Sequence, residues 1–339
     1  MTVLPTNEEL DGGRPAKEDL DRVLESHRRE LTGYCYRMLG SGAEAEDAVQ
    51  ETMIRAWRKI DSFEGRSALR SWLYRIAHNV CLDQLRGRNR RARPMDLGPS
   101  APADTVLGSV LPEHAWVQPI ADERILPVEA DPAELSAARE SIRLAFVAAL
   151  QHLPPQQRAV LILREVLRWQ ATEVADLLST TVPAVNSALQ RARATLAAKD
   201  IPSLDEGGAT AAGDLDEEHD ALLARYLEAF EKYDIGELVS LIAEDATFSM
   251  PPFALWLEGT TDIAAWYVGQ GIGCKDARLL PVKVNGTGGF GAYKKVHEGL
   301  WEPFCIQLLE ITDGRFTGLH HFLDPTLFAD FGLPPRIEA

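Results

Sequence analysis

The chain has 339 residues, of which 45% are hydrophobic and 25% charged, and its formal net charge is −16. This length predicts two or three domains, each with an ordinary core. No apolar run reaches the roughly 18 residues of a membrane span, the acidic N-terminus is unlike a signal peptide, and four scattered cysteines have no metal-binding or redox spacing. We therefore expect a cytoplasmic protein with reduced thiols and without a bound metal or cofactor.

The charge is distributed unevenly along the chain. Residues 1–95 carry a net charge of +2 and residues 141–199 a net charge of +4, whereas residues 96–140 carry −7 and residues 200–339 carry −15. The overall acidity therefore does not exclude contact between nucleic acid and the two N-terminal segments. The acidic C-terminal half is expected to lie elsewhere or to compete with nucleic acid.

Apolar residues at helical spacing predict a compact all-α bundle over residues 20–95. A first helix ends at Gly40–Gly42, and the second begins with acidic residues that suit the dipole at a helix N-terminus. A loop then leads into the stretch Ser67–Arg93, for which Ser67 is a candidate N-cap.

The stretch Ser67–Arg93 combines an apolar stripe with a cationic, aromatic face. Cations attract phosphates and aromatic rings stack on unpaired bases, so this face suits single-stranded nucleic acid. A solvated basic helix is the alternative interpretation, because charge runs are often only solvated faces. The cationic face carries Arg66, Arg70, Tyr74 and His78, and the arginines that follow are Arg86, Arg88, Arg90, Arg91 and Arg93.

Residues 44–91 resemble region 2 of extracytoplasmic-function (ECF) sigma factors. The resemblance implies that the helix matching Asp47–Trp57 docks on the β′ clamp helices of RNA polymerase. It also implies that Phe63–Arg86 binds the minus-10 element as a single strand and captures a flipped base. The DNA contacts expected are Arg66, Ser67, Arg70, Tyr74, His78 and Asn79, and the polymerase contacts are Asp47, Gln50, Glu51, Arg55 and Trp57. The apolar spacing nevertheless favours core positions for Trp57 and Trp72.

Residues 96–140 form an acidic linker, rich in Pro and Ala, that we expect to be mostly extended or disordered when free. In the resembled family this linker passes near the polymerase active-site channel. The apolar piece His114–Pro119 looks like the tryptophan-proline motif of sigma factors with a C-terminal extension. A local cluster that pins the linker to a domain is the alternative.

Residues 141–199 predict a second helical domain with a helix-turn-helix. Ala171–Leu178 and Val182–Ala198 form two helices around the turn Ser179–Thr181. Asn and Gln side chains read base edges and Arg reads guanine or phosphate, so the polar face of the second helix suits the major groove. The domain resembles region 4 of the same family, which reads the minus-35 element. The candidate contacts are Asn186, Ser187, Gln190, Arg191 and Arg193.

Two departures from the region 4 pattern stand out. Ser179 occupies a position where the family often has Gly, and Arg168-Trp169-Gln170 stands where members often have Gly-Trp-Ser. If Ser179 needs a positive φ, its side chain costs about 1–2 kcal/mol.

Residues 200–216 form an acidic, Gly/Ala-rich tether, and residues 217–335 predict helices followed by a strongly bent antiparallel sheet. This α+β cone resembles the SnoaL-like fold, and the order of the three matches resembles SigG-like members of the sigma family. Cyclases and isomerases of the fold use an Asp, with or without a His. The candidates here are His297, His320, His321 and Asp324, although only one of the adjacent histidines can point inward from a strand.

Together these features predict two all-α sigma domains and a C-terminal SnoaL-like cone. The resemblance implies an alternative sigma factor, not an enzyme, that directs promoter recognition and melting and is regulated by its C-terminal domain. Its expected partners are RNA polymerase core, through the β′ clamp helices and the β flap, and promoter DNA, but no membrane. The alternatives are a ligand-responsive DNA-binding regulator with the cone as sensor, and an enzyme fused to DNA-binding parts.

Overall fold

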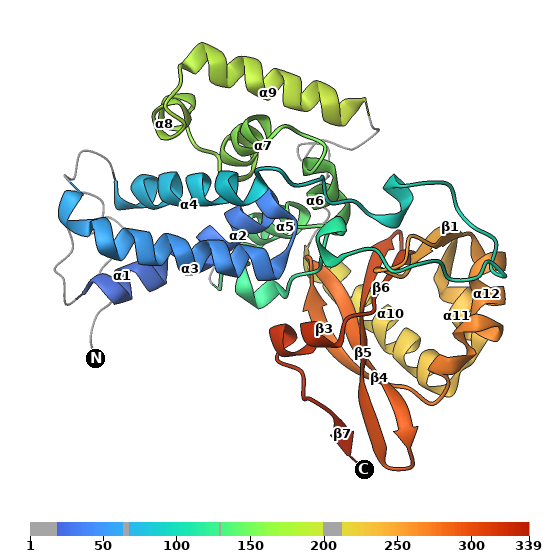
Figure 1. Cartoon of the computed structure of the whole chain (residues 1–339). Helices are drawn as coiled ribbons and strands as arrows, with labels where there is room; N and C mark the ends of the chain where they lie inside the picture. The colour runs from blue at the N-terminus through green and yellow to red at the C-terminus, as the bar shows by residue number, and fades with distance from the viewer. Residues whose placement is uncertain (1–18, 64–67, 129, 199–211, 339) are drawn as a thin grey trace. The chain divides into compact units, whose positions relative to one another are not determined.

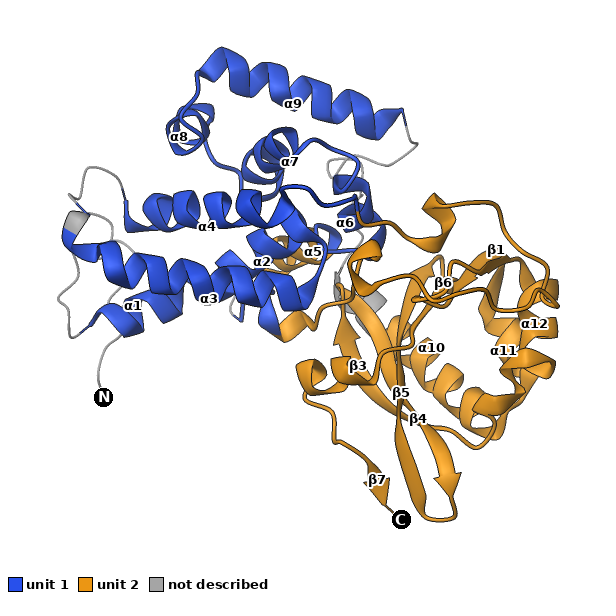
Figure 2. Cartoon of the chain, in the orientation of Figure 1, with its two compact units in different colours: residues 1–90, 124–130, 140–207 blue, residues 91–123, 131–139, 208–339 orange. Residues whose placement is uncertain are grey.

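The computed structural model describes residues 19–63, 68–128, 130–198 and 212–338. The chain divides into two compact units, each assembled from several stretches of sequence (Figure 2). The first unit comprises residues 1–90, 124–130 and 140–207, and the second comprises residues 91–123, 131–139 and 208–339. The segment that follows the first helical bundle therefore belongs to the same unit as the C-terminal domain.

The first unit begins with a helical bundle in which α2, α3 and α4 lie side by side (Figure 1). Tyr34 and Met38 of α2 and Leu73 of α4 are fully buried in its core, and the Tyr34 ring lies 5.3 Å from that of Tyr74 on α4. Gly40 ends α2 in a left-handed conformation, with a φ of 72°, and the Ser41 hydroxyl accepts the Glu44 N–H at 3.3 Å to cap α3. The helices are α1 (Leu20–Ser26), α2 (Arg28–Leu39), α3 (Gly42–Lys59) and α4 (Leu69–Leu85), with a 3-10 turn, η1 (Ile60–Ser62), after α3.

The same unit contains a second set of helices, which includes the predicted helix-turn-helix. Pro155 occupies the first turn of α7, where its missing N–H costs nothing. A π-helical turn, η5 (Ile162–Val166), follows α7 directly. The helices are α6 (Leu144–Leu150), α7 (Pro155–Leu161), α8 (Ala171–Leu177) and α9 (Val182–Ala197).

Arg158 of α7 joins the two sets of helices. Its Nη1 donates to the carbonyl of Met38, at the end of α2, and to Gln151 Oε1. Its Nη2 donates to the carbonyls of Gln151 and Leu153, at 3.2 and 3.1 Å. Burial lowers the pKa of Arg158 to about 10, so the side chain remains a cation at neutral pH. Three of its four hydrogen bonds are to backbone carbonyls and one is to the Gln151 side chain.

The second unit is built on one curved sheet with the strand order β2-β1-β6-β5-β4-β3, with β7 paired to β5. All its neighbouring strands are antiparallel except β1 and β6, which run parallel. The strands are β1 (Ile242–Ser249), β2 (Trp256–Glu258), β3 (Arg278–Val284), β4 (Thr287–His297), β5 (Leu300–Thr312), β6 (Arg315–Phe322) and β7 (Ile337–Glu338).

Helices cover one face of this sheet and enclose an aromatic core. Tyr226 of α10 lies at the centre, with ring centroids 5.6 Å from Phe230, 5.7 Å from Phe290 and 5.3 Å from Phe316. The α+β arrangement expected from the resemblance to the SnoaL-like fold is confirmed. The helical elements are α10 (Ala212–Lys232), α11 (Ile235–Leu241), α12 (Thr260–Val268), η6 (Gln270–Cys274) and η7 (Pro325–Phe331).

The linker region is mostly extended but is hydrogen-bonded along the second unit. The Trp256 indole N–H donates to the carbonyl of Gly98 at 2.9 Å. The Ile120 N–H donates to Asn285 Oδ1 at 2.9 Å, and the Asn285 N–H returns a bond to the Ile120 carbonyl at 3.1 Å. Turns interrupt the segment at η2 (Pro94–Asp96), η3 (Glu113–Ala115) and η4 (Asp122–Arg124), and a helix that periodicity did not predict, α5 (Pro132–Glu140), follows.

The apolar piece around Trp116 is pinned within the second unit. Trp116 and Val117 are each only 2% exposed, and Ala92 forms a parallel bridge with Trp116. Arg91 donates to the carbonyls of Glu113 and Trp116 at 3.1 and 2.6 Å. The local cluster that was the alternative interpretation of this piece is thus present. Within the described ranges, no helix is both long and apolar enough to cross a bilayer.

Candidate nucleic-acid interface

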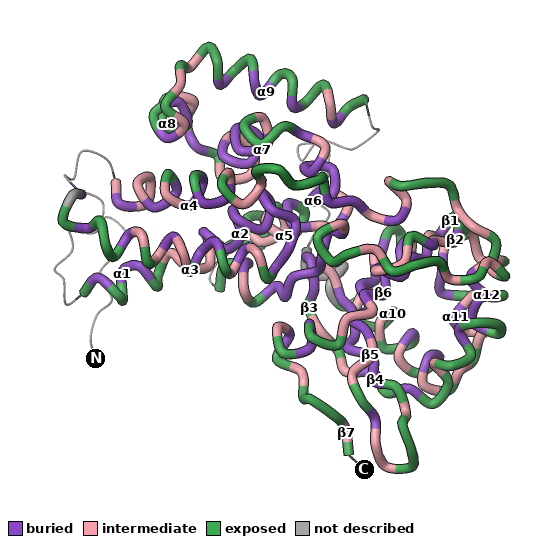
Figure 3. Tube along the Cα trace, in the orientation of Figure 1, coloured by how far each residue is buried: buried purple, intermediate pink, exposed green. Residues whose placement is uncertain are grey.

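Helix α9 presents a continuous polar face and buries the opposite one. Thr181 caps its start, since the Thr181 hydroxyl accepts the Ala184 N–H at 3.3 Å. Val185, Leu189 and Ala192 are buried, and exposed positions recur along the outer side of the helix (Figure 3). All five residues expected to contact DNA are exposed, namely Asn186, Ser187, Gln190, Arg191 and Arg193.

The backbone leading to α9 has a left-handed conformation at both positions where the chain departs from the family's glycines. Arg168 has a φ of 56° and Ser179 a φ of 52°. Left-handed backbone disfavours residues with a Cβ. Ser179 therefore has the positive φ at which its side chain was expected to cost energy. Arg168 has a positive φ as well.

Helix α4 holds Arg70, Tyr74 and His78 on one face, but this face is not open. The Arg70 Nε donates to Glu30 Oε2 at 2.8 Å, and the Tyr74 hydroxyl lies 3.5 Å from the same oxygen. His78 Nδ1 is 2.9 Å from the Tyr34 hydroxyl. Tyr74 and His78 are both buried, whereas Asn79 is exposed. Arg66 and Ser67 lie outside the described residues, and the N-cap of α4 is Ala68, not the candidate Ser67.

The face of α4 that carries Arg70, Tyr74 and His78 is less positively charged than its sequence indicates. Burial lowers the pKa of His78 to about 4, so the imidazole is neutral at pH 7. Burial alone would raise the pKa of Glu30, but the His27 hydrogen bond and the Arg70 charge hold it below the ordinary value. Arg70 therefore meets an ionised partner, and its charge is partly neutralised.

Trp169 covers the α4 face from within the same unit. Its ring centroid lies 4.9 Å from that of Tyr74, and the Arg70 guanidinium carbon lies 5.1 Å from the indole centroid. Trp169 is 5% exposed. The sequence drew attention to Trp169 only through the altered Gly-Trp-Ser pattern, and nothing in its spacing indicated contact with α4.

The arginines after α4 were expected to attract phosphates, but most of them are paired with other groups of the protein. Helix α4 ends at Leu85. Gly87 follows with a φ of 72°, which is a left-handed conformation outside the helical range. Arg91 is buried and bonded to carbonyls, Arg88 pairs with Glu44, Arg90 bonds His152 at 2.6 Å, and Arg93 pairs with Asp96 at 3.5 Å. Arg86 has a side chain 80% exposed, and it pairs with Asp83 at 3.2 Å.

Helix α3 carries the residues expected to contact polymerase. Asp47 and Gln50 are exposed, whereas the Arg55 Nε is bound to Glu51 Oε1 at 2.6 Å. Trp57 is 50% exposed, so the core position that its spacing favoured is wrong. Ile54, which sequence reasoning missed, is 38% exposed three residues before it. Trp72, by contrast, is half-buried against Phe63, with centroids 5.2 Å apart.

The histidines of the C-terminal domain are divided between the two faces of the sheet. His321 pairs across the sheet with Gln307, which accepts the Tyr226 hydroxyl at 3.2 Å, so His321 faces the helices. His320 faces the other side, as strand alternation requires. His297 is exposed, and Asp324 caps η7 by accepting the Thr326 N–H at 2.9 Å.

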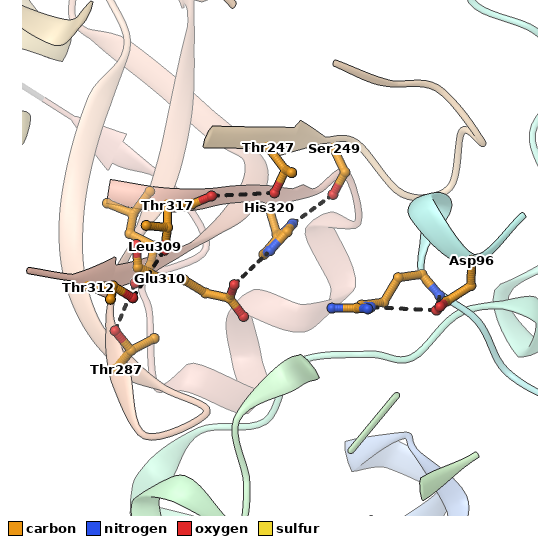
Figure 4. A network of polar contacts seen from close by, with 10 residues as sticks. Asp96, Thr247, Ser249, Thr287, Leu309, Glu310, Thr312, Thr317 and His320 are labelled. Carbon is orange, nitrogen blue, oxygen red and sulfur yellow. Dashed lines mark hydrogen bonds and ion pairs between the residues drawn. The ribbon is translucent and has the colours of Figure 1, made fainter. Parts of the chain in front are cut away.

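His320 belongs to a buried polar chain across three strands (Figure 4). Its Nδ1 is 2.9 Å from the Ser249 hydroxyl, and its Nε2 is 3.6 Å from Glu310 Oε2. A Cβ at Gly318 would lie 2.8 Å from both Glu310 Oε2 and His320 Nε2, so glycine makes room for the contact. Ser249 and His320 are each 1% exposed, which keeps them from any substrate in this conformation.

The sequence matches two families along its first 200 residues. The family model described as Sigma-70 region 2 matches residues 23–91, and the model described as Sigma-70, region 4 matches residues 143–196.

The chain is also similar to whole proteins. It is 44% identical over 343 residues to the ECF RNA polymerase sigma factor SigG of Mycobacterium tuberculosis, covering 99% of this chain and 90% of that protein. It is 28% identical to SigJ of the same organism, over 92% of this chain and 94% of that protein. The crystal structure of M. tuberculosis SigJ superposes with a TM-score of 0.59 at 23% identity, covering 93% of this chain and all of that one. This last match shows a shared fold.

Proposed function

Because the chain belongs to the ECF family of RNA polymerase sigma factors, we propose that α3, α4 and α9 divide the work of promoter recognition between them. The predicted general function is confirmed by the full-length similarity: the chain is an alternative sigma factor that directs transcription initiation. It therefore binds RNA polymerase core and promoter DNA. The assignment of these partners to individual surfaces is our proposal, as is the cytoplasmic location where polymerase acts.

The minus-35 element is assigned to α9. The observation that carries this assignment is a capped helix with five exposed polar side chains on one side and a fully buried apolar row on the other. Asn186 and Gln190 lie one turn apart, a spacing that allows both amides to reach base edges in one major groove. Arg191 supplies charge for the flanking phosphates, and Arg193, which pairs with Glu165, does so by exchanging that carboxylate for a phosphate.

A binding assay with promoter duplex tests the role of α9. Asn186→Ala and Gln190→Ala should each weaken binding of polymerase holoenzyme to a cognate minus-35 sequence by about 1–3 kcal/mol while relaxing base preference at one position. Arg191→Ala should weaken cognate and altered sequences alike. Thr195→Ala, on the same helix but outside the polar face, is the matched control. Unchanged base preference in both amide variants would contradict the assignment.

Polymerase docking is assigned to α3. Ile54 and Trp57 expose apolar surface beside the polar side chains of Asp47 and Gln50, and an aromatic anchor within a polar rim is typical of protein interfaces. We expect the partner to be the β′ clamp helices, with the β flap meeting the α8–α9 region. Trp57→Ala should reduce retention of the chain on immobilised core enzyme by about tenfold. Trp256→Ala, in the second unit, should not.

The minus-10 strand is assigned to α4, with Arg70, Tyr74 and Asn79 as its contacts. Cationic and aromatic groups at helical spacing support this assignment, although Tyr74 and His78 are covered in the conformation described here. Contact therefore requires the Trp169 segment to leave α4. Transcription by core enzyme from a supercoiled cognate promoter should fall several-fold in Arg70→Ala.

Regulation is assigned to the C-terminal domain. The supporting observation is that residues 91–123, which connect the two DNA-binding segments, are hydrogen-bonded to that domain within one unit. A domain that holds the linker can restrict how the two segments reach the promoter elements. Transcription from a cognate promoter should therefore change when residues 205–339 are deleted, and unchanged output would exclude autoregulation.

A further inference from the structure

We propose that Trp169 is an internal surrogate for an unstacked promoter base, occupying a stacking site that Arg70 and Tyr74 offer on α4. In this proposal, the free protein shields its own single-strand site with an indole, and DNA must displace that indole to bind. The proposal rests on the assignment of α4 to the minus-10 strand.

The geometry of the stacking site fits a planar heteroaromatic ring. The Arg70 guanidinium carbon lies 5.5 Å from the Tyr74 centroid and 5.1 Å from the Trp169 centroid, so one cation contacts both rings. The centroids of the two rings lie 4.9 Å apart and the rings are tilted by 57°, so Tyr74 meets the indole at an angle and not face to face. Proteins hold splayed bases with the same two groups, an aromatic ring and an arginine plane. A base in place of the indole would keep both contacts.

The position of Arg70 is fixed by a partner other than Trp169. Glu30 Oε2 accepts from the Arg70 Nε at 2.8 Å, and Tyr74 packs edge-on against Tyr34, with centroids 5.3 Å apart. Because these contacts come from α2, the stacking site keeps its shape when the indole leaves. A preformed site costs less ordering on binding than one assembled by the ligand.

The indole is held in the site at some cost. Its N–H is buried without a hydrogen-bond partner among the described residues, an arrangement that typically costs about 1–3 kcal/mol. The preceding residue, Arg168, has left-handed backbone. An exposed hydrogen bond, from Arg75 to the carbonyl of Asp176 at 3.0 Å, ties α8 to α4 nearby. The contact is thus one that a competing ligand could replace.

Fluorescence anisotropy with two labelled 12-mers tests the proposal on the full chain without polymerase. One probe carries mixed-sequence single-stranded DNA, and the other is an abasic 12-mer with the same phosphates. We expect Trp169→Ala to bind the base-bearing probe about tenfold more tightly than the wild type, as stacking of one base would provide. Trp169→Phe, which keeps a ring in the site, should stay near the wild type, and the abasic probe should not distinguish the variants.

Two further measurements keep the outcome clear. Trp169→Leu keeps apolar volume without a flat ring, and it replaces Trp169→Ala if that variant has lost its cooperative thermal transition. It should show the same tenfold increase in affinity for the base-bearing probe. In the wild type, the base-bearing probe should speed amide hydrogen exchange around residues 163–178, and the abasic probe should not. Equal affinities of all variants, or an equal gain for the abasic probe, would overturn the surrogate role.

The failure of the surrogate can be told apart from the failure of the assignment of α4. If transcription by holoenzyme falls in Arg70→Ala while Trp169 variants bind DNA like the wild type, only the surrogate is wrong. If Arg70→Ala transcribes normally, the assignment of α4 itself is wrong.

Discussion

Two buried histidines make the stability of the chain depend on pH. Burial lowers the pKa of His78 to about 4 and that of His321 to about 3. In the unfolded chain each imidazole titrates near its ordinary pKa of about 6.5. Between the two values the unfolded state binds more protons than the folded state, so folding stability falls as the pH falls.

For the first unit, the free energy of unfolding should decrease as the pH is lowered from 6.5 to 4. Each such histidine contributes at most about 1.4 kcal/mol per pH unit in this range and nothing above it. His78→Gln, which can still bond the Tyr34 hydroxyl, should flatten the slope of the transition that reports on α2–α4. Urea unfolding monitored at pH 7.5 and pH 5.0 measures it. A slope unchanged in His78→Gln would assign the acid sensitivity to other groups.

Ser179 illustrates how far a single residue could be predicted. The resemblance to region 4 singled out this position because glycine is frequent there, and the observed φ of 52° gives the reason. We expect Ser179→Gly to stabilise the helix-turn-helix by about 1 kcal/mol, because relief of the left-handed strain exceeds the added entropy of the unfolded chain. Thermal melting checks the gain, and Ser187→Gly, in the middle of α9, should destabilise instead.

At the scale of elements, hydrophobic spacing located most of the helices and strands but not their surroundings. The start of α9 at Val182, for example, follows directly from the pattern. The same pattern placed Trp57 in the core, because spacing identifies a stripe without saying which neighbour covers it. Helix α5 was missed, since it has no buried residues and hence no periodicity.

Arg158 shows why packing between elements was beyond prediction. It lies in an apolar sequence, QQRAVLIL, and nothing there indicates that its partners are carbonyls of Met38 and Leu153. Arg158→Met should lower stability by about 3 kcal/mol, because several buried acceptors lose their donor at once. Arg143→Met, which breaks a pair with Glu140, should cost under about 1 kcal/mol. Chemical denaturation compares the two, and similar losses would argue against a structural role for Arg158.

At the scale of the whole molecule, the linker was expected to be mostly extended or disordered when free, and in the structure it is hydrogen-bonded to the C-terminal domain. The composition of residues 96–140 predicted the absence of regular structure, which describes most of the segment, but composition says nothing about hydrogen bonds to a distant turn. Asn285 supplies two of those bonds, and its φ of 50° marks the turn between β3 and β4.

Removing the Asn285 side chain should release this part of the linker. Asn285→Gly tolerates the left-handed backbone but lacks the oxygen that accepts the Ile120 N–H, so amide exchange at Ile120 should quicken about tenfold. Asn285→Asp keeps an acceptor and should show a smaller effect. If the linker restrains promoter binding, Asn285→Gly should also shift transcription in the same direction as deletion of residues 205–339. Opposite shifts would contradict that link.

The interleaving of the two units limits how the protein can be divided. Residues 91–123 and 131–139 belong with the C-terminal domain, whereas residues 124–130 and 140–207 belong with the helices. The C-terminal domain therefore cannot be exchanged for another domain by joining the chains at a single position. A cut within residues 200–211 should leave both fragments associated on a sizing column, and a chimaera that swaps only residues 212–339 would pair a foreign domain with a linker shaped for another surface. Any graft has to carry the linker with it.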